Sequence, residues 1–111
     1  MLTLDKVKMT VIQTAENGVV NKDTLFYFTQ EGNVVQAEYA GGKIKKGFLI
    51  GQIDVHVLRF RDCQLQTDGV LDNGVSSCEL SMSDTGRIRL VEHFEWKSMS
   101  GETGVNVFQE I

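Results

Sequence analysis

Apolar and polar residues alternate along the stretch Arg87-Ile88-Arg89-Leu90-Val91-Glu92-His93-Phe94-Glu95-Trp96-Lys97. Successive side chains of a β-strand point to opposite faces, so a period of two predicts a strand with one dry face and one wet face. The dry face would carry Ile88, Leu90, Phe94 and Trp96. Glu92 lies in phase with these apolar residues.

Glu92 is therefore the leading site candidate of the chain. An ionised carboxylate on a dry face costs several kcal/mol unless it is paired, hydrated or protonated. Two interpretations follow. Glu92 is either a structural group that accepts hydrogen bonds from Arg59, Tyr39 or Trp96, or a general acid or base whose pKa is raised toward neutrality.

The rest of the chain reads as further short strands separated by turn residues. The sequence has 11 glycines and no proline, and Asn-Gly and Asp-Gly pairs supply the positive φ angles of tight hairpin turns. Turns are expected at 16–18, 31–33, 41–42, 68–69, 73–74, 84–86 and 101–104. The β-rich runs between them are 6–14, 24–30, 34–39, 44–50, 53–61, 65–67, 75–82, 87–97 and 105–111.

This pattern predicts an all-β fold of eight or nine strands in an antiparallel meander. Residues 1–111 are expected to form a single domain, because a chain of this length builds one core. Closure into an up-and-down barrel of the lipocalin (calycin) kind removes exposed strand edges, and a two-sheet β-sandwich is the alternative. About eight strands leave an interior that is filled by side chains or admits one small ligand.

Composition excludes several classes of function. The net charge is −4 and the Lys and Arg residues are scattered, so no nucleic-acid partner is expected. No apolar run is long enough to span a membrane and none resembles a secretory signal, which favours a cytoplasmic protein. Cys63 and Cys78 form no metal-ligand pattern and are expected to be reduced. No metal or other cofactor is predicted.

A small-molecule site is the preferred functional hypothesis. The face of Val35, Ala37 and Tyr39 is expected to point into the core. Arg59 alternates with Val55 and Val57, so it could point inward and pair with Glu92. Tyr39, Arg59, Glu92 and Trp96 are then predicted to line a small lumen and to bind a polar or amphipathic metabolite.

Assembly through apolar strands is the second expectation. The runs 24–28 and 55–60 carry apolar residues on both faces, which is typical of a strand that also contacts another subunit. A homodimer is expected, since two-fold dimers are the commonest soluble oligomers. The contact surface would include Phe26, Phe28, Leu58 and Phe60.

A resemblance adds to this interpretation. The pattern Tyr39-x-Gly41-Gly42-x-Ile44-x-x-Gly47 and the strand Glu92-x-Phe94-x-Trp96 resemble a family of uncharacterised bacterial proteins of about this length that are often labelled N-acetylglutamate synthases. That label implies an acyltransferase, but the chain lacks the Gly-rich loop and helix amino terminus that hold the pyrophosphate of acetyl-CoA. Where relatives are expected to carry a Tyr and a His, this sequence has Asp62 and Gln64.

Three classes of function therefore stay open. The first is binding of a small molecule in the lumen. The second is an enzyme, for example an isomerase, lyase or acyltransferase, with Glu92 as its acid or base. The third is a structural or partner-binding oligomer. Of these, binding without catalysis is favoured.

Overall fold

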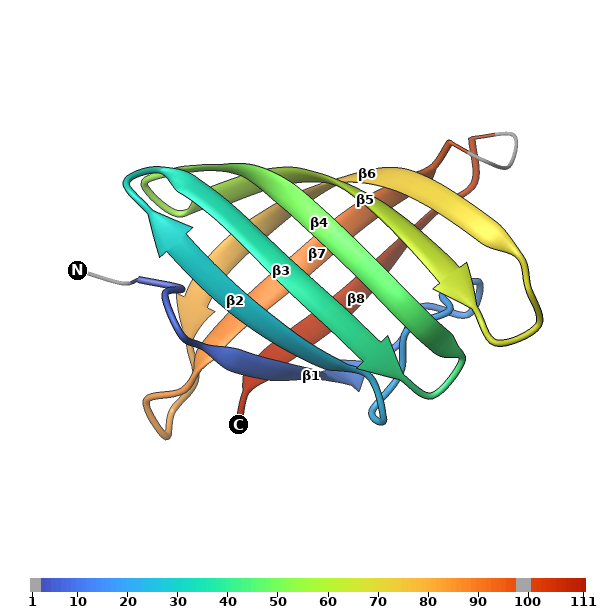
Figure 1. Cartoon of the computed structure of the whole chain (residues 1–111). Coiled ribbons are helices and arrows are strands. Elements are labelled where there is room, and N and C mark those ends of the chain that lie inside the picture. Colours follow the sequence, from blue (N-terminus) through green and yellow to red (C-terminus); the bar gives the residue numbers. More distant parts are fainter. Residues whose placement is uncertain (1–2, 98–100) are drawn as a thin grey trace.

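The computed structural model describes residues 3–97 and 101–111. It is a closed barrel in which eight antiparallel strands follow one another in sequence order (Figure 1). The last strand pairs with the first, with Met9 opposite Glu110 and Val11 opposite Phe108. The strands are β1 (Lys8–Gln13), β2 (Leu25–Glu31), β3 (Val34–Gly41), β4 (Ile44–Asp54), β5 (Val57–Gln66), β6 (Leu71–Met82), β7 (Ile88–Trp96) and β8 (Thr103–Glu110).

The predicted up-and-down barrel is confirmed, and the sandwich alternative is wrong because the β1–β8 pairing closes the sheet on itself. Three local predictions differ from the structure. The run 65–67 is the end of β5 and its turn, and Asn73-Gly74 lies inside β6. The break expected near residue 51 falls instead at Val55 and His56, where Val55 adopts a φ of 55°.

Alternation places the core side chains inside the barrel. On β7, residues Ile88, Leu90, Glu92, Phe94 and Trp96 are all buried. The predicted inward face of β3 is also buried, since Val35, Ala37 and Tyr39 are at most 4% exposed. Both cysteines are free, Cys63 exposed and Cys78 buried.

Tyr39 and Gly47 explain part of the glycine pattern. They are register partners on β3 and β4 and both face the interior. A Cβ atom on Gly47 would lie 2.3 Å from the Tyr39 ring. The absence of a side chain at Gly47 thus lets the ring lie flat over the neighbouring strand, an arrangement common where aromatic residues cover glycines in sheets.

The outer surface differs from the expectation. Phe26, Phe28, Leu58 and Phe60 are all buried inside the barrel, so they cannot form a subunit contact. The residues that alternate with them along β2 and β5 point outward instead. Successive side chains of a strand point to opposite faces, and the set with the larger apolar residues is the buried one. The most exposed apolar side chains on the strands β2 to β5 are Tyr27, Phe48 and Ile50, at 50%, 52% and 59% exposure.

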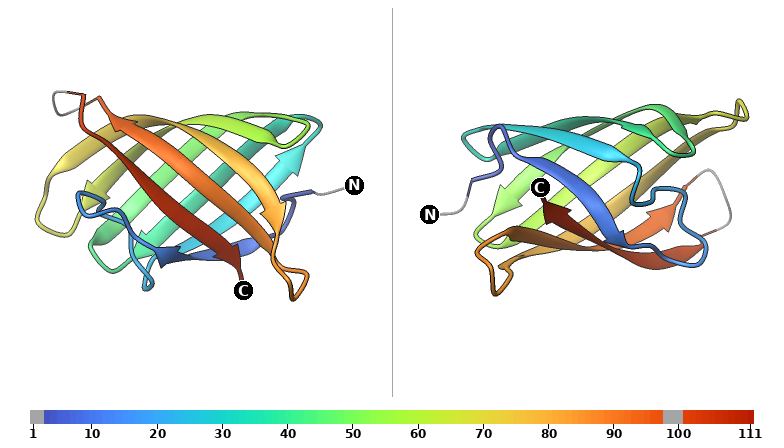
Figure 2. Two further views of the ribbon diagram at one scale, coloured as in Figure 1. Left: turned by 180° about the vertical axis from the view of Figure 1, so that it is seen from behind. Right: turned by 90° about the horizontal axis from the view of Figure 1, so that it is seen from below.

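The two ends of the barrel are closed differently. Short hairpins connect β2 to β3 and β4 to β5 at one end. The long connection 14–24 crosses the other end, together with the turns at 42–43 and 67–70 (Figures 1 and 2). Within the described ranges, no helix is long and apolar enough to cross a membrane.

The first strand pairs unevenly with its two neighbours. β1 and β2 share two register partners, Lys8 with Tyr27 and Met9 with Phe26. In contrast, β2 pairs with β3 along its whole length, from Leu25 to Glu31. β1 is therefore attached to the barrel chiefly through β8.

Candidate ligand site in the barrel interior

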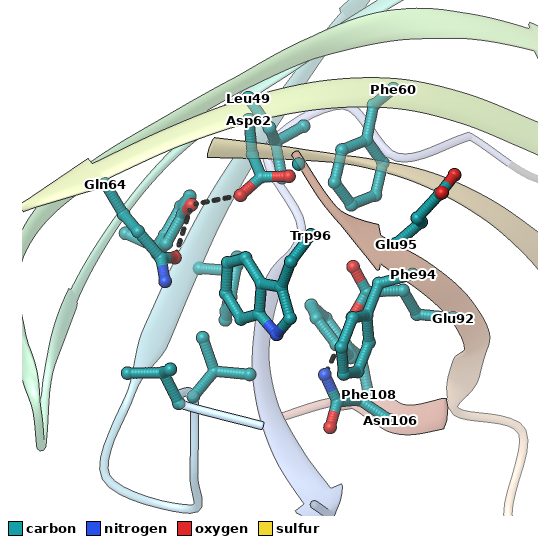
Figure 3. A pocket seen from close by; sticks show the side chains of 15 residues that line it. Leu49, Phe60, Asp62, Gln64, Glu92, Phe94, Glu95, Trp96, Asn106 and Phe108 are labelled. Atoms are coloured by element: carbon teal, nitrogen blue, oxygen red, sulfur yellow. Dashed lines mark hydrogen bonds between the residues drawn. The ribbon is translucent and has the colours of Figure 1, made fainter. Parts of the chain in front are cut away.

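The interior contains a cavity of about 30 Å³ at the end that the connection 14–24 covers. A volume of this size holds about two water molecules. Val19 and Val20 of the connection form part of its wall, and the other apolar walls come from the strands. The cavity lining is Val19, Val20, Phe26, Tyr39, Leu49, Phe60, Asp62, Gln64, Gly74, Glu92, Phe94, Glu95, Trp96, Asn106 and Phe108 (Figure 3).

Glu92 lies at the centre of one polar cluster. Ser76 of β6 donates its hydroxyl to Glu92 Oε2 at 2.6 Å, and Asn106 of β8 donates its amide to Glu92 Oε1 at 2.9 Å. The same Asn106 accepts the backbone N–H of Ala15 at 2.7 Å. The carboxyl group is thus held by both neighbouring strands and connected to the segment that covers the cavity.

Tyr39 organises a second polar cluster on the opposite wall. Its hydroxyl lies 2.9 Å from Gln64 Oε1 and 3.4 Å from Asp62 Oδ2. The donor bond to Gln64 is the shorter of the two. Asp62 and Gln64 follow each other on the inner face of β5, in phase with Leu58 and Phe60.

Burial changes the proton affinity of both inward carboxyl groups. Desolvation raises the pKa of Glu92 to about 7, against the hydrogen bonds from Ser76 and Asn106, which lower it. Desolvation likewise raises the pKa of Asp62 to about 6. The Tyr39 hydroxyl stays protonated because burial and the two carboxylates raise its pKa far above the usual range. Glu92 can therefore gain or lose a proton near neutral pH.

Trp96 stands between the two clusters. In Figure 3 its indole ring lies between the side of Asp62 and Gln64 and the side of Glu92 and Asn106. Its Nε1 atom is buried and has no hydrogen-bond partner among the described residues, and the same holds for Gln64 Nε2. A buried N–H group without a partner costs about 1–3 kcal/mol. These two donors are therefore the groups of the cavity that most need an acceptor.

Three of the four residues predicted to bind a ligand meet at this cavity. Tyr39, Glu92 and Trp96 all belong to its wall. Arg59 does not, because its side chain is exposed on the outside of β5 while its neighbours Leu58 and Phe60 point inward. The expected ion pair between Arg59 and Glu92 is therefore wrong.

Sequence reasoning missed several polar residues of the interior. Ser76, Asn106, Asp62 and Gln64 each lie in phase with buried apolar residues of their strands. That is the same signal that identified Glu92. In the described parts of the chain, no group of three or more His, Cys, Asp or Glu residues is placed to hold a metal ion.

A closed antiparallel barrel of eight strands that pair in sequence order is a barrel of the calycin type. The chain belongs to the avidin-like protein family, whose model matches residues 2–111. Avidin-like barrels bind small molecules and typically form oligomers. Neither the curated proteins nor the solved structures include a match to this chain.

Family membership corrects the resemblance drawn from the sequence. The family-model match is to avidin-like barrels and not to an N-acetylglutamate synthase family. Two glycines of the pattern that suggested the resemblance have structural roles in the barrel. Gly47 makes room for the Tyr39 ring, and a Cβ on Gly41 would lie 2.1 Å from the backbone oxygen of Asp23.

Proposed function

We propose that this barrel binds a small polar or amphipathic molecule whose polar head enters the cavity and accepts hydrogen bonds from Trp96 Nε1 and Gln64 Nε2. The observation that carries this proposal is the pair of buried donors without a partner in the described chain. Apolar walls with a few convergent polar groups are the usual composition of ligand pockets. Family membership supports the same conclusion.

The volume sets a limit on how much of the molecule is enclosed. A cavity of about 30 Å³ admits only a few atoms, so the remainder would extend toward the connection 14–24. Val20 is buried in this connection and Val19 is partly buried against the core. Binding of a larger molecule therefore requires these two side chains to move.

Native mass spectrometry of the purified protein is the first test. A small molecule that leaves only under denaturing conditions would support the proposal and give the mass of the ligand. In parallel, a thermal-shift panel of small metabolites that includes biotin should contain compounds that raise the melting temperature. Binding should weaken in Trp96→Phe, which lacks the indole N–H, and persist in Tyr27→Phe, which alters an exposed ring. A bare mass together with an unresponsive panel would contradict the proposal.

We further propose that the protein forms a homodimer through the outer face of β2 to β5. Tyr27 on β2 and Phe48 and Ile50 on β4 support this, because large exposed apolar side chains gathered on one wall are typical of a contact surface. Tyr27 and Phe48 share one cross-strand row, with Glu38 between them. A two-fold axis through this face would bring the same apolar side chains of two copies together.

Sedimentation equilibrium tests the assembly. Phe48→Asp should shift the protein from dimer to monomer, because a carboxylate in an apolar contact loses its hydration. Val105→Asp is the matched control, since Val105 is exposed on β8 in the opposite wall. A monomeric parent protein, or a dimer that Phe48→Asp leaves intact, would show that this face is not the contact.

A further inference from the structure

The charges around the cavity are of one sign. Asp62, Glu92 and Glu95 belong to its wall, and among the residues that the structure describes no Lys, Arg or His belongs to it. Glu95 is compensated at the rim by Lys97, whose ammonium lies 3.0 Å from Glu95 Oε1. The hydrogen-bond partners of Asp62 and Glu92 are neutral Tyr39, Ser76 and Asn106.

A buried carboxylate is costly when its partners are only neutral donors. Removing a charge from water costs free energy, and a nearby opposite charge recovers much of this cost. The two carboxyl groups are also close enough that Asp62 disfavours ionisation of Glu92. The interior therefore offers negative charge that nothing in the described wall neutralises.

A second and independent observation indicates a bound molecule. Trp96 and Gln64 are 6% and 2% exposed, and each has a buried nitrogen without a hydrogen-bond partner at this cavity. Both nitrogens carry hydrogen, so both require an acceptor such as an oxygen atom. A simple cation alone would satisfy the carboxylates and leave these donors unpaired.

We propose that the molecule held in the barrel carries a positively charged nitrogen with an oxygen close to it, as in an amino alcohol or an amino amide. The nitrogen interacts with Asp62 and Glu92, and the oxygen accepts from Trp96 Nε1 and Gln64 Nε2. The inference rests on the small-molecule binding proposed above and adds the chemical class of the head group. The indole ring of Trp96 in the same wall adds to the attraction, because an aromatic ring attracts a nearby cation.

Like charges argue against an acidic head group. A carboxylate or phosphate placed in this cavity would face Asp62 and Glu92 without a compensating base in the described wall. A neutral hydroxyl or amide could accept from Trp96 but would leave the charge of Asp62 uncompensated. The order of affinity for heads of equal size is therefore cationic, then neutral, then anionic.

Trp96 provides a direct readout, because the chain contains one tryptophan. The test is a titration of the ¹⁵N-labelled full chain with ethanolamine, ethylene glycol and glycolate, which share a two-carbon skeleton and differ in charge. Ionic strength is held constant and the single indole N–H signal is followed. We expect a saturable shift with ethanolamine, half-complete at a concentration at least about tenfold lower than with ethylene glycol. Glycolate should produce no saturable shift.

Two variants separate local charge from the overall charge of the protein. Asp62→Asn should reduce the preference for ethanolamine over ethylene glycol, whereas Asp54→Asn removes the same charge from an exposed position on β4 and should leave the preference unchanged. An equal effect of both variants would overturn the proposal. So would a preference for glycol or glycolate, or the lack of any saturable shift with ethanolamine.

The outcomes also distinguish this inference from the function on which it rests. If a neutral or acidic compound binds in a way that depends on Trp96, the small-molecule site stands and the charge of the head group is refuted. If the purified protein carries no ligand and no compound of the metabolite panel stabilises it, the binding function itself fails.

Discussion

Asn106 joins Glu92 to the segment that covers the cavity. Its amide nitrogen donates to Glu92 Oε1 at 2.9 Å, while its oxygen accepts the backbone N–H of Ala15 at 2.7 Å. One side chain therefore holds both the central carboxyl group and the start of the connection 14–24. The two contacts give the barrel end a defined conformation without a covalent link.

Replacing this bridge should loosen the covering segment. Asn106→Leu keeps the approximate side-chain volume but leaves the Ala15 N–H and one oxygen of Glu92 without partners, at about 1–3 kcal/mol for each buried group. We expect a lower urea midpoint and faster hydrogen exchange at Ala15. Asn17→Leu is the control, because Asn17 makes an exposed contact from the same connection, to the Thr103 oxygen at 3.0 Å. Equal losses in both variants would argue against a special role of Asn106.

The raised pKa of Glu92 predicts an unusual pH dependence of stability. Between its ordinary value of 4.5 and the folded value of about 7, the folded protein binds a proton that the unfolded chain has released. Stability from this group is therefore fully present below pH 4.5. About 3 kcal/mol is lost as the pH rises to about 7.

Urea unfolding of the parent protein and of Glu92→Gln, from pH 4 to pH 8, measures the contribution of Glu92 to the free energy of unfolding. Glutamine keeps the shape and cannot titrate, so the difference in unfolding free energy between the two proteins should change with pH in the stated direction. Asp62 also reduces the free energy of unfolding as the pH rises from its ordinary pKa of 3.8 to about 6. This effect is present in both proteins and has the same sign in each. A difference that is independent of pH would mean that Glu92 has an ordinary pKa.

The hydroxyl of Ser76 stabilises the ionised form of Glu92 through a bond of 2.6 Å. Ser76→Ala should therefore raise the pKa of Glu92 further above 7. The chemical shift of the Glu92 carboxyl carbon, followed by NMR through a pH titration, measures the change. Ser77→Ala is the matched control, since Ser77 is the exposed neighbour on the same strand. An unchanged or lowered pKa in Ser76→Ala would refute the assignment.

Gly47 should not tolerate a methyl group. In Gly47→Ala the new Cβ would overlap the Tyr39 ring, and overpacking of this kind costs about 1–3 kcal/mol. Gly32→Ala is the comparison, because Gly32 has a φ of 62° but open space around it. Only a backbone penalty of about 1–2 kcal/mol is expected there, because a Cβ atom disfavours the left-handed conformation.

A double variant isolates the clash. Tyr39→Leu removes the ring that the new methyl would strike, so the losses of Gly47→Ala and Tyr39→Leu should be less than additive in thermal unfolding. If the two stability losses are strictly additive, the cost of Gly47→Ala does not come from contact with the Tyr39 ring.

The general fold could be predicted from the sequence because it depends on local signals. Alternation on β3 and β7 and the turn residues between strands require no knowledge of distant contacts. The closure of β1 on β8 followed from the need to remove exposed edges. The buried position of Glu92 followed from its phase with Leu90 and Phe94 alone.

The errors arose where one local choice controls a whole strand. The turn at Val55 and His56 lies later than expected and requires a φ of 55° at Val55, a conformation that β-branched residues rarely adopt. Because β5 carries apolar residues in both phases, the sequence did not fix which phase faces inward. The predicted inward position of Arg59 is wrong for this reason, and the same ambiguity of phase hides the inward positions of Asp62 and Gln64.

The wider site depends on contacts across the barrel. The bonds from Tyr39 to Gln64 and from Asn106 to Glu92 connect different strands, and which inward side chains lie at the same height depends on register. Register is set by all the hairpins together. The phase of each polar residue was visible in the sequence, but its partner was not.

The short pairing between β1 and β2 bears on kinetics. β1 and β2 share two register partners, so separating these two strands costs less free energy than separating any fully paired strands of the barrel. The connection 14–24 joins these same two strands beside the cavity. We therefore expect β1 and β2 to separate when a molecule enters or leaves the barrel. The rate of this separation governs the residence time of a bound molecule, whereas the interior groups govern its affinity.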